Sequence, residues 1–222
     1  MRPSPESDIA ATAATAAAAA AAVKPAETVV TAKTASVAYT SPGGIVFRRL
    51  AIPDDIPMIH GWFQQPHAKF WCLQGSSVAE VRELYAAQLA SGFRDVHIGS
   101  LHGEPVVLAE SYDPRFDQLA DHYAVAPGDL GMHICVAPAR QPVRGFSRLV
   151  FQAVMDLMFD GLGARRVVVE PDAHNDRIHV LNKTFGFVYR GDVQLREKVA
   201  SLALCTRADY RTALQHLQEI PA

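Results

Sequence analysis

The chain has 222 residues, with 21 Lys and Arg against 23 Asp and Glu, a formal net charge of −2 and a pI near 6.5. This balance excludes the strongly basic surface typical of proteins that bind nucleic acid or anionic membranes, so we expect neither partner. A hydrophobic content of 49% excludes a wholly disordered chain. The three cysteines are an odd number without the spacing of a zinc or redox motif, which predicts buried thiols in a reducing, cytoplasmic compartment.

The first 44 residues differ in composition from the rest. Eleven of the thirteen residues 10–22 are alanine, and this run is shorter than the roughly 20 residues that a helix needs to cross a bilayer. The acidic Glu6 and Asp8 before it are not typical of a secretory signal peptide. We interpret residues 1–44 as a disordered leader, with a targeting tail or a misplaced start codon as alternatives, and residues 45–222 as one domain.

The first half of this domain predicts helices and an antiparallel hairpin. Ser77 and Glu80 have the spacing of a capping box, which predicts a helix as far as about residue 91. The β-like runs 96–101 and 105–112 are separated by a short His-Gly-Glu turn, which favours a hairpin. The other predicted elements are a strand at 45–50, a helix at 53–62 with an aromatic-rich segment behind it, and a strand at 130–137.

The second half predicts a parallel strand pair. Apolar residues recur at three- and four-residue spacing from Phe146 to Met158, which indicates an amphipathic helix. A valine run at 166–170 follows and is typical of a strand buried on both faces, so residues 130–170 should form a βαβ unit. The remaining predicted elements are a helix at 175–184, a strand pair at 187–195 and 198–205, and a helix at 207–217.

This element order predicts an α+β fold with a three-layer α/β/α-like arrangement. The sheet should be mixed, with about seven strands and with helices on both faces. It is too irregular for a doubly wound nucleotide-binding fold.

The loop before the predicted helix at 146–158 is a candidate anion site. The first amides of a helix have no intrahelical partner, and a glycine there lets a phosphate approach the backbone. Arg140 and Arg144 add positive charge, and Gly145, Phe146 and Ser147 begin the helix. An ordinary helix start with solvated arginines is the alternative.

A second group of polar residues follows the valine strand, at the carboxyl edge where sheets with parallel strands bind ligands. Asp172 is placed there to orient a base or to cap the next helix, and Asn175 has the sequence position of an N-cap.

The third candidate is His133, within the strand predicted at 130–137. Strand alternation places it on the same face as Gly131 and Cys135, opposite Met132. A histidine on an apolar strand is a base or a satisfied core residue, and we interpret Cys135 as structural.

Metal catalysis and serine hydrolysis are not supported by the motifs. His174 and His179 are five residues apart, beyond the spacing that places two imidazoles on one helical face. No Gly-x-Ser-x-Gly sequence is present. We therefore expect no metal.

This sequence resembles the GCN5-related N-acetyltransferase (GNAT) superfamily. The resemblance lies in the order of a strand, the Arg-containing loop, a helix, a second strand and the later Gly-Phe. The strings GMHICVAP, VVVEPDAHNDRIHVLNKTFGFVYRGDV and LREKVASLALCTRADY are similar to its hydroxamate-siderophore branch, which includes aerobactin-, rhizobactin- and alcaligin-type acyltransferases and the mycobactin lysine acyltransferase. The resemblance covers residues 46–214.

The resemblance implies acyl-CoA, as acetyl-CoA or succinyl-CoA, for the co-substrate. Its pyrophosphate would lie on residues 140–147 and its pantetheine beside Ile134, Cys135 and Val136, with Asn175 as a further contact. Val143 stands where the superfamily usually has its first glycine, so fewer amides should face the phosphates.

In this branch, His133 and Asp172 match the catalytic pair. We expect His133 to accept the proton of an N-hydroxylated amine, Asp172 to orient the base or the substrate, and an amide near residues 134–136 to stabilise the thioester oxyanion. If the two parallel strands run level, His133 should lie near Val167 or Val168.

The acceptor side is defined less closely. The aromatic cluster of Trp62, Phe63, Phe70 and Trp71 is core or a wall of the amine site, and Glu110 or Asp113 would hold the distal ammonium of a diamine or lysine. A siderophore synthetase or an amine monooxygenase of the same pathway would be a partner. Two alternatives to hydroxamate formation stay open, namely acetylation of ordinary amines and a non-catalytic acyl-CoA-binding role.

Overall fold

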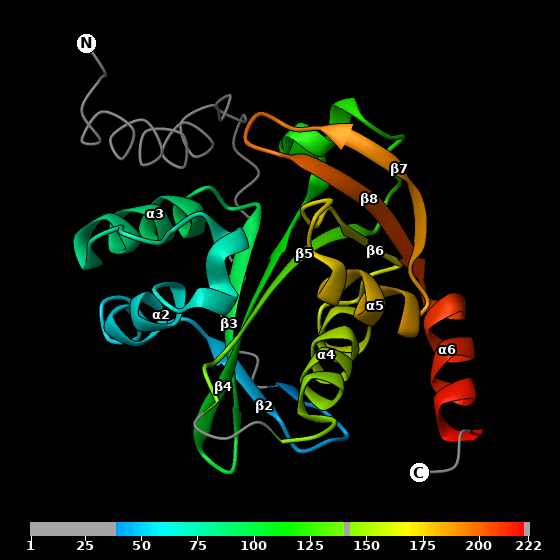
Figure 1. The fold of residues 1–222 in the computed structure, drawn as a ribbon, viewed down its shortest axis with the longest axis horizontal. Coiled ribbons are helices and arrows are strands. Elements are labelled where there is room, and N and C mark those ends of the chain that lie inside the picture. The colour runs from blue at the N-terminus through cyan, green and yellow to red at the C-terminus, as the bar shows by residue number, and fades with distance from the viewer. Residues whose placement is uncertain (1–38, 140–142, 220–222) are drawn as a thin grey trace.

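The computed structural model describes residues 39–139 and 143–219 (Figure 1). The predicted leader up to residue 38 and the loop residues 140–142, with Arg140 among them, lie outside these ranges. Within the described residues no helix is long and apolar enough to span a membrane.

Eight strands of the described residues form one sheet in the order β1-β2-β3-β4-β5-β6-β8-β7. Neighbouring strands are antiparallel, apart from the parallel pair β5–β6. The strands are β1 (Tyr39–Thr40), β2 (Val46–Arg49), β3 (Arg94–Leu101), β4 (Glu104–Tyr112), β5 (Asp129–Val136), β6 (Arg166–Val169), β7 (Val188–Gln194) and β8 (Val199–Thr206). The predicted mixed α+β fold is confirmed, and β1 pairs with β2 ahead of the domain start expected at residue 45.

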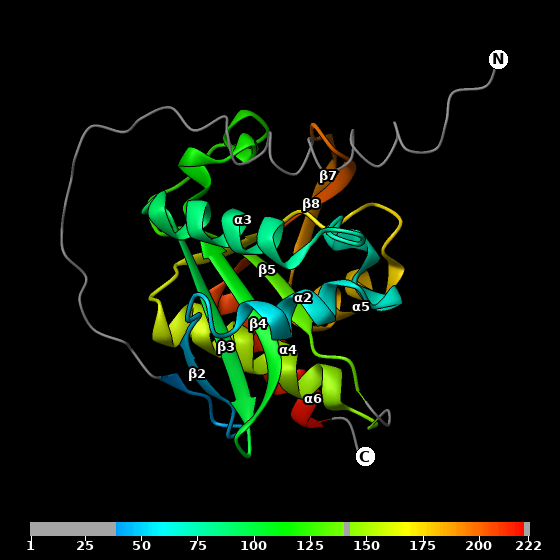
Figure 2. The same ribbon diagram turned by 90° about the vertical axis from the view of Figure 1, so that its left-hand side faces the viewer.

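The helices cover both faces of the sheet. Figure 2 shows α2 and α3 in front of one face, and Figure 1 shows α4, α5 and α6 on the other. Their bounds are α2 (Ile56–Phe63), α3 (Val78–Ala90), α4 (Phe146–Asp156), α5 (Asp176–Thr184) and α6 (Arg207–Glu219), with short helical turns η1 (Pro66–Trp71), η2 (Pro114–Phe116), η3 (Gln118–Asp121) and η4 (Leu157–Gly161). The predicted capping box of α3 is formed, since the Ser77 side chain accepts from the Glu80 amide and Glu80 accepts from the Ser77 amide.

The two faces have separate apolar cores. Trp62, Phe63 and Val81 belong to the core under α2 and α3, together with Cys135 of β5. Met132 belongs to the core under α4 and α6. The alternation predicted along β5 is therefore correct, and it places His133 on the α2–α3 side of the sheet.

The parallel pair separates after three residues. β5 and β6 are paired at Asp129↔Arg166, Leu130↔Val167 and Gly131↔Val168, and β5 then continues to Val136 against β4 alone. Beyond β6 the chain follows β8, because the Ser201 amide donates to the Pro171 carbonyl. This divergence opens the sheet at the carboxyl ends of its two central strands.

Gly131 makes room for Tyr112 beside this opening. A Cβ atom at Gly131 would lie 2.1–2.4 Å from three ring atoms of Tyr112. The Tyr112 side chain is buried, and its hydroxyl donates to Glu170. The missing side chain at residue 131 therefore fixes where this hydroxyl lies.

Gly131→Ala should destabilise the domain by about 1–3 kcal/mol, because the new methyl group forces the buried Tyr112 ring to move. Urea denaturation measures this. The control is Gly61→Ala in α2, where no atom lies within 4 Å of the new Cβ and the change should be neutral or stabilising by up to about 1 kcal/mol. Equal stability of Gly131→Ala and the wild type would contradict this packing account.

Candidate active site

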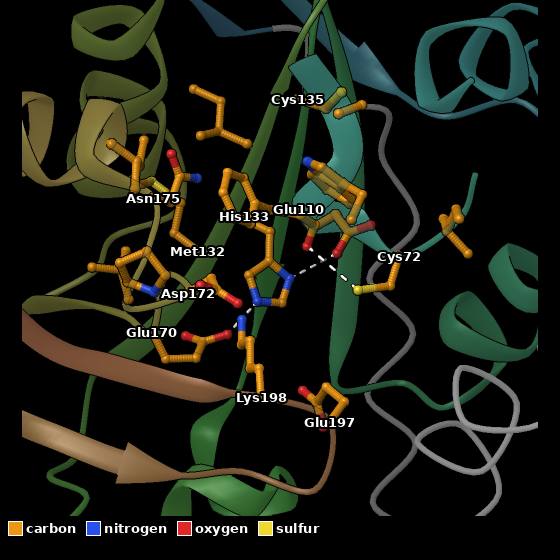
Figure 3. Close-up of a pocket in the computed structure, with 18 of the residues that line it drawn as sticks. Cys72, Glu110, Met132, His133, Cys135, Glu170, Asp172, Asn175, Glu197 and Lys198 are labelled. Carbon is orange, nitrogen blue, oxygen red and sulfur yellow. Dashed lines mark hydrogen bonds and ion pairs between the residues drawn. The ribbon is translucent and has the colours of Figure 1, made fainter. Parts of the chain in front are cut away.

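A cavity of about 1610 Å³ lies where β5 and β6 diverge. His133 is among the residues that line it. The lining also includes Ser147 and Phe151 of α4, Ile178 of α5, the turn η1 and the C-terminal half of α3. The loop between β7 and β8 contributes Lys198, whose side chain extends towards His133 in Figure 3.

His133 is held between two buried carboxylates. Its Nδ1 lies 3.0 Å from Oε2 of Glu110 on β4, and its Nε2 contacts Oε1 of Glu170, which follows β6. Glu110 is the residue paired directly with His133 across the β4–β5 ladder. We call Glu110, His133 and Glu170 the carboxylate clamp (Figure 3).

Tyrosine hydroxyls donate hydrogen bonds to the remaining oxygen of each carboxylate. Tyr85 of α3 donates to Glu110 Oε1 at 2.7 Å, and Tyr112 donates to Glu170 Oε2 at 2.8 Å. All four carboxylate oxygens thus accept a hydrogen bond. The pKa values of Glu110 and Glu170 are lowered, so both carboxylates are ionised and can only accept. We therefore assign both ring nitrogens of His133 as donors and the ring as an imidazolium.

The electrostatics agree with this assignment. Burial lowers the pKa of His133, but the charge of Glu170 and the hydrogen bonds to both carboxylates outweigh it and raise the pKa to about 9. Burial raises the pKa of Glu170, yet the charge and hydrogen bond of His133, followed by the charge of Lys198, lower it to about 2. Burial also raises the pKa of the Cys135 thiol, to about 12, which supports the structural role predicted for it.

The pKa of His133, about 9, lies above the near-neutral value that we expected of a base, because both ring nitrogens face carboxylates. Its role in catalysis stays a prediction. The predicted level alignment with Val167 or Val168 is wrong. The register Gly131↔Val168 places His133 beside Glu170, two residues further along.

Asp172 does not contact His133. Its carboxylate accepts from the His174 amide at 2.8 Å and lies 3.1 Å from His174 Nδ1. Its carbonyl accepts from His179 Nε2 at 3.1 Å. The two residues of the expected pair thus line one cavity without a hydrogen bond between them.

Other expected positions have mixed outcomes. Asn175 lines the cavity at the N-cap of α5, without a side-chain capping bond. Asp113 is paired with Arg115, so neither it nor Glu110 is free for a distal ammonium. Trp71 packs edge-on to His133 with ring centroids 6.1 Å apart, so the aromatic segment serves both as core and as cavity wall.

A model of the acetyltransferase (GNAT) domain matches residues 51–195. The chain belongs to the GNAT family. It is accordingly an acyl-CoA-dependent N-acetyltransferase, with acyl-CoA as co-substrate.

Two curated relatives and one solved structure illustrate this GNAT membership. The N-hydroxyputrescine acetyltransferase of Acinetobacter baumannii is 26% identical over 170 residues, covering 76% of this chain and 81% of that protein. The lysine N-acyltransferase MbtK of Mycobacterium sp. (strain MCS) is 30% identical over 157 residues, covering 69% of this chain and 64% of that protein. The structure of AAC(6′)-Ib in complex with paromomycin and acetyl-CoA has a TM-score of 0.66 at 24% identity, covering 75% of this chain and 96% of that one, and shares the fold.

The start of α4 in this GNAT domain fits an anionic group. Gly145 is the N-cap of α4, has φ +82° and carries no side chain to cap the helix, and no atom lies within 4 Å of a Cβ built on it. The first-turn amides of Ser147 and Arg148 therefore have no capping side chain. Arg144 and Phe146 flank the turn, and Ser147 lines the cavity.

The edge of β5 fits an extended chain with amide groups. The Ala137 amide donates to the Val106 carbonyl of β4, so alternation directs the amides of Ile134 and Val136 away from β4, into the gap that β6 leaves. On the same edge His67 donates to the Val136 carbonyl at 2.9 Å. Peptide-like groups of a ligand can pair with this edge.

No group of three or more His, Cys, Asp or Glu side chains suited to a metal ion occurs in residues 39–139 and 143–219.

The free energy of unfolding should fall as the pH rises from 6.5 to 8.5. The folded-state pKa of His133, about 9, lies above its ordinary value of 6.5, so its stabilisation is complete below pH 6.5 and is lost as the pH approaches 9. This interval lies below the ordinary pKa of 9.0 of the buried thiols Cys135 and Cys205. Urea denaturation at pH 6.5, 7.5 and 8.5 measures the change.

The matched control is His67→Gln, which removes an exposed histidine from the same cavity and should retain the decline. A stability that stays level or rises between pH 6.5 and 8.5 would contradict an imidazolium at residue 133.

Proposed function

We propose that this enzyme transfers an acetyl or succinyl group from acyl-CoA to the N-hydroxylated amine of a diamine or lysine, which forms a hydroxamate in siderophore biosynthesis. The observation that carries the proposal is that one cavity is lined by the start of α4, by β5 and by a histidine whose two ring nitrogens both face carboxylates. Such a site suits an amine that is uncharged on arrival. The similarity to an N-hydroxyputrescine acetyltransferase extends over 76% of the chain and supports the same substrate class.

In the proposed reaction the hydroxylamine nitrogen attacks the thioester carbonyl carbon. A C–N bond forms, the carbonyl oxygen becomes an oxyanion, and the amide of Ile134 or Val136 stabilises it. The C–S bond then breaks, and the proton from nitrogen ends on the sulfur of CoA. No net proton is taken up or released.

The carboxylate clamp acts here through its charge. The clamp itself has two carboxylates and one imidazolium, with Lys198 beside Glu170. In this proposal the carboxylates stabilise the positive charge that develops on the attacking nitrogen. Asp172 lines the cavity beside the clamp and orients the acceptor amine in this proposal.

The reaction defines its place in a pathway. An amine monooxygenase must supply the N-hydroxylated substrate, and a synthetase that condenses hydroxamates would consume the product. We propose a cytoplasmic location for this step, where acyl-CoA is made.

Acetylation of ordinary amines is the second candidate, because one relative is named a lysine N-acyltransferase. An alkylammonium must lose a proton before it attacks, and His133 has no free nitrogen to accept one. This observation favours the hydroxylated amine.

The purified protein should release free CoA thiol from acetyl-CoA or succinyl-CoA when it is offered N-hydroxyputrescine, N-hydroxycadaverine or N-hydroxylysine. The unhydroxylated parents are the matched controls and should react at least about 100-fold more slowly at pH 7, a difference of about 2.7 kcal/mol in the barrier. Equal rates for the parents would support ordinary amine acetylation. Binding of acyl-CoA without turnover of any amine would support a non-catalytic role.

Gly145→Ala should raise the KM for acetyl-CoA about fivefold or more with little change in kcat, a loss of about 1 kcal/mol in ground-state binding. The new methyl group occupies open space at the start of α4, where the phosphates are expected. Gly163→Ala is the control, since Gly163 has a similar φ of +74° with no neighbour within 4 Å and lies after η4, away from the start of α4. A similar KM increase in both variants would indicate backbone strain alone.

A further inference from the structure

Every ring nitrogen and every carboxylate oxygen of the carboxylate clamp takes part in a hydrogen bond. Both nitrogens of His133 are bound to carboxylates, and the remaining carboxylate oxygens accept from Tyr85 and Tyr112. Glu110 and Glu170 are buried, whereas the His133 side chain is 32% exposed. Because both nitrogens are engaged, the cavity meets no free basic nitrogen at His133.

The groups around the carboxylate clamp also favour hydrogen bonds from both nitrogens of His133 to the carboxylates. Both carboxylates contact the ring nitrogens, and Lys198 lies near enough to Glu170 for its charge to lower the pKa of that carboxyl. The groups that face His133 or its carboxylates from the packed elements are Arg94 of β3, Glu110 and Tyr112 of β4, Tyr85 of α3, Trp71 of η1, Asp117 between η2 and η3, Cys135 of β5, Glu170 after β6, and Lys198 before β8. Asp117 is paired with Arg94 at 2.7 Å, so this pair adds no net charge.

We propose that Glu110 and Glu170 determine the acceptor specificity of this enzyme, because by holding both nitrogens of His133 they restrict it to amines that are weakly basic and uncharged at neutral pH. The inference rests on the proposed function and deepens it, since the selected property is the basicity of the nitrogen and not its hydroxyl group. Glu110 and Glu170 are positioning residues that act through His133.

The chemistry gives the size of the effect. An alkylamine with a pKa near 10.4 is neutral in only about one molecule in 2,500 at pH 7. Without a free base in the site, only that fraction reacts, and its rate rises about tenfold for each pH unit. A weakly basic amine is already neutral, so its rate does not change with pH in the same range.

Three analogues of one diamine test the proposal with the wild-type enzyme. They are N-hydroxyputrescine, N-methoxyputrescine and putrescine, and the readout is kcat/KM between pH 6.5 and 8.5. We expect similar, pH-independent values for the hydroxy and methoxy compounds, and a value for putrescine that is at least about 100-fold lower at pH 7 and rises about tenfold per pH unit.

The outcomes separate the two proposals. Turnover of the hydroxy compound with rejection of the methoxy compound would overturn selection by basicity and leave the proposed function in place. Turnover of the methoxy compound with rejection of the hydroxy compound would overturn the proposed function and support selection by basicity. A pH-independent rate for putrescine equal to the others would overturn both.

Variants then assign the selectivity to the carboxylates. Glu110→Gln or Glu170→Gln removes one of the two negative charges next to His133. Either variant should lower the ratio of kcat/KM for N-hydroxyputrescine to that for putrescine at least tenfold at pH 7.5, because a neutral imidazole becomes available as a base.

Tyr85→Phe keeps both carboxylates and should retain most of the ratio, which provides a folded comparison if a glutamine variant is unstable. Glu83→Gln removes an equal charge from the exposed face of α3 and should leave the ratio unchanged. An unchanged ratio in a folded Glu110→Gln or Glu170→Gln variant would overturn the assignment.

Discussion

The site depends on a partly buried imidazolium between two buried carboxylates. Burying three charged groups is unfavourable unless each is paired and hydrogen-bonded. The fold meets this requirement from four elements: β4 supplies Glu110, β5 supplies His133, the end of β6 supplies Glu170, and tyrosines of α3 and β4 complete the carboxylate shells. Removing any one partner leaves a buried charge without compensation.

The divergence of β5 and β6 supplies the other half of the site. It leaves the Ile134 and Val136 amides without a strand partner, next to the α4 terminus that begins at Gly145. The same divergence places Glu170 at the point where β6 leaves β5, directly against His133. One feature of the sheet therefore positions both the open edge of β5 and the charged cluster, and this explains why both lie in one cavity.

Much of the fold could be predicted from the sequence, because its signals are local. The capping box at Ser77, the turn between β3 and β4, and the valine run of β6 each specify an element from neighbouring residues. The strand alternation placed His133 and Cys135 on the correct face for the same reason.

The clamp could not be predicted in this way, because it depends on register between strands far apart in the sequence. A difference of 37 positions between β5 and β6 brings Glu170 to His133, and no local pattern specifies that number. Tyr85 lies 25 residues from Glu110 and on another layer. Gly131 was the available signal, since a glycine within a buried strand indicates a close approach, here by Tyr112.

The central claim is that His133 is a doubly protonated ring at neutral pH. Nuclear magnetic resonance of the protein labelled with nitrogen-15 in its histidines, with His133→Gln to assign the signals, tests it most directly. The account predicts that both ring nitrogens of His133 carry a proton at pH 7.5 and that the ring titrates with a pKa near 9. A neutral ring at pH 7.5, titrating at or below the ordinary value of 6.5, would contradict it.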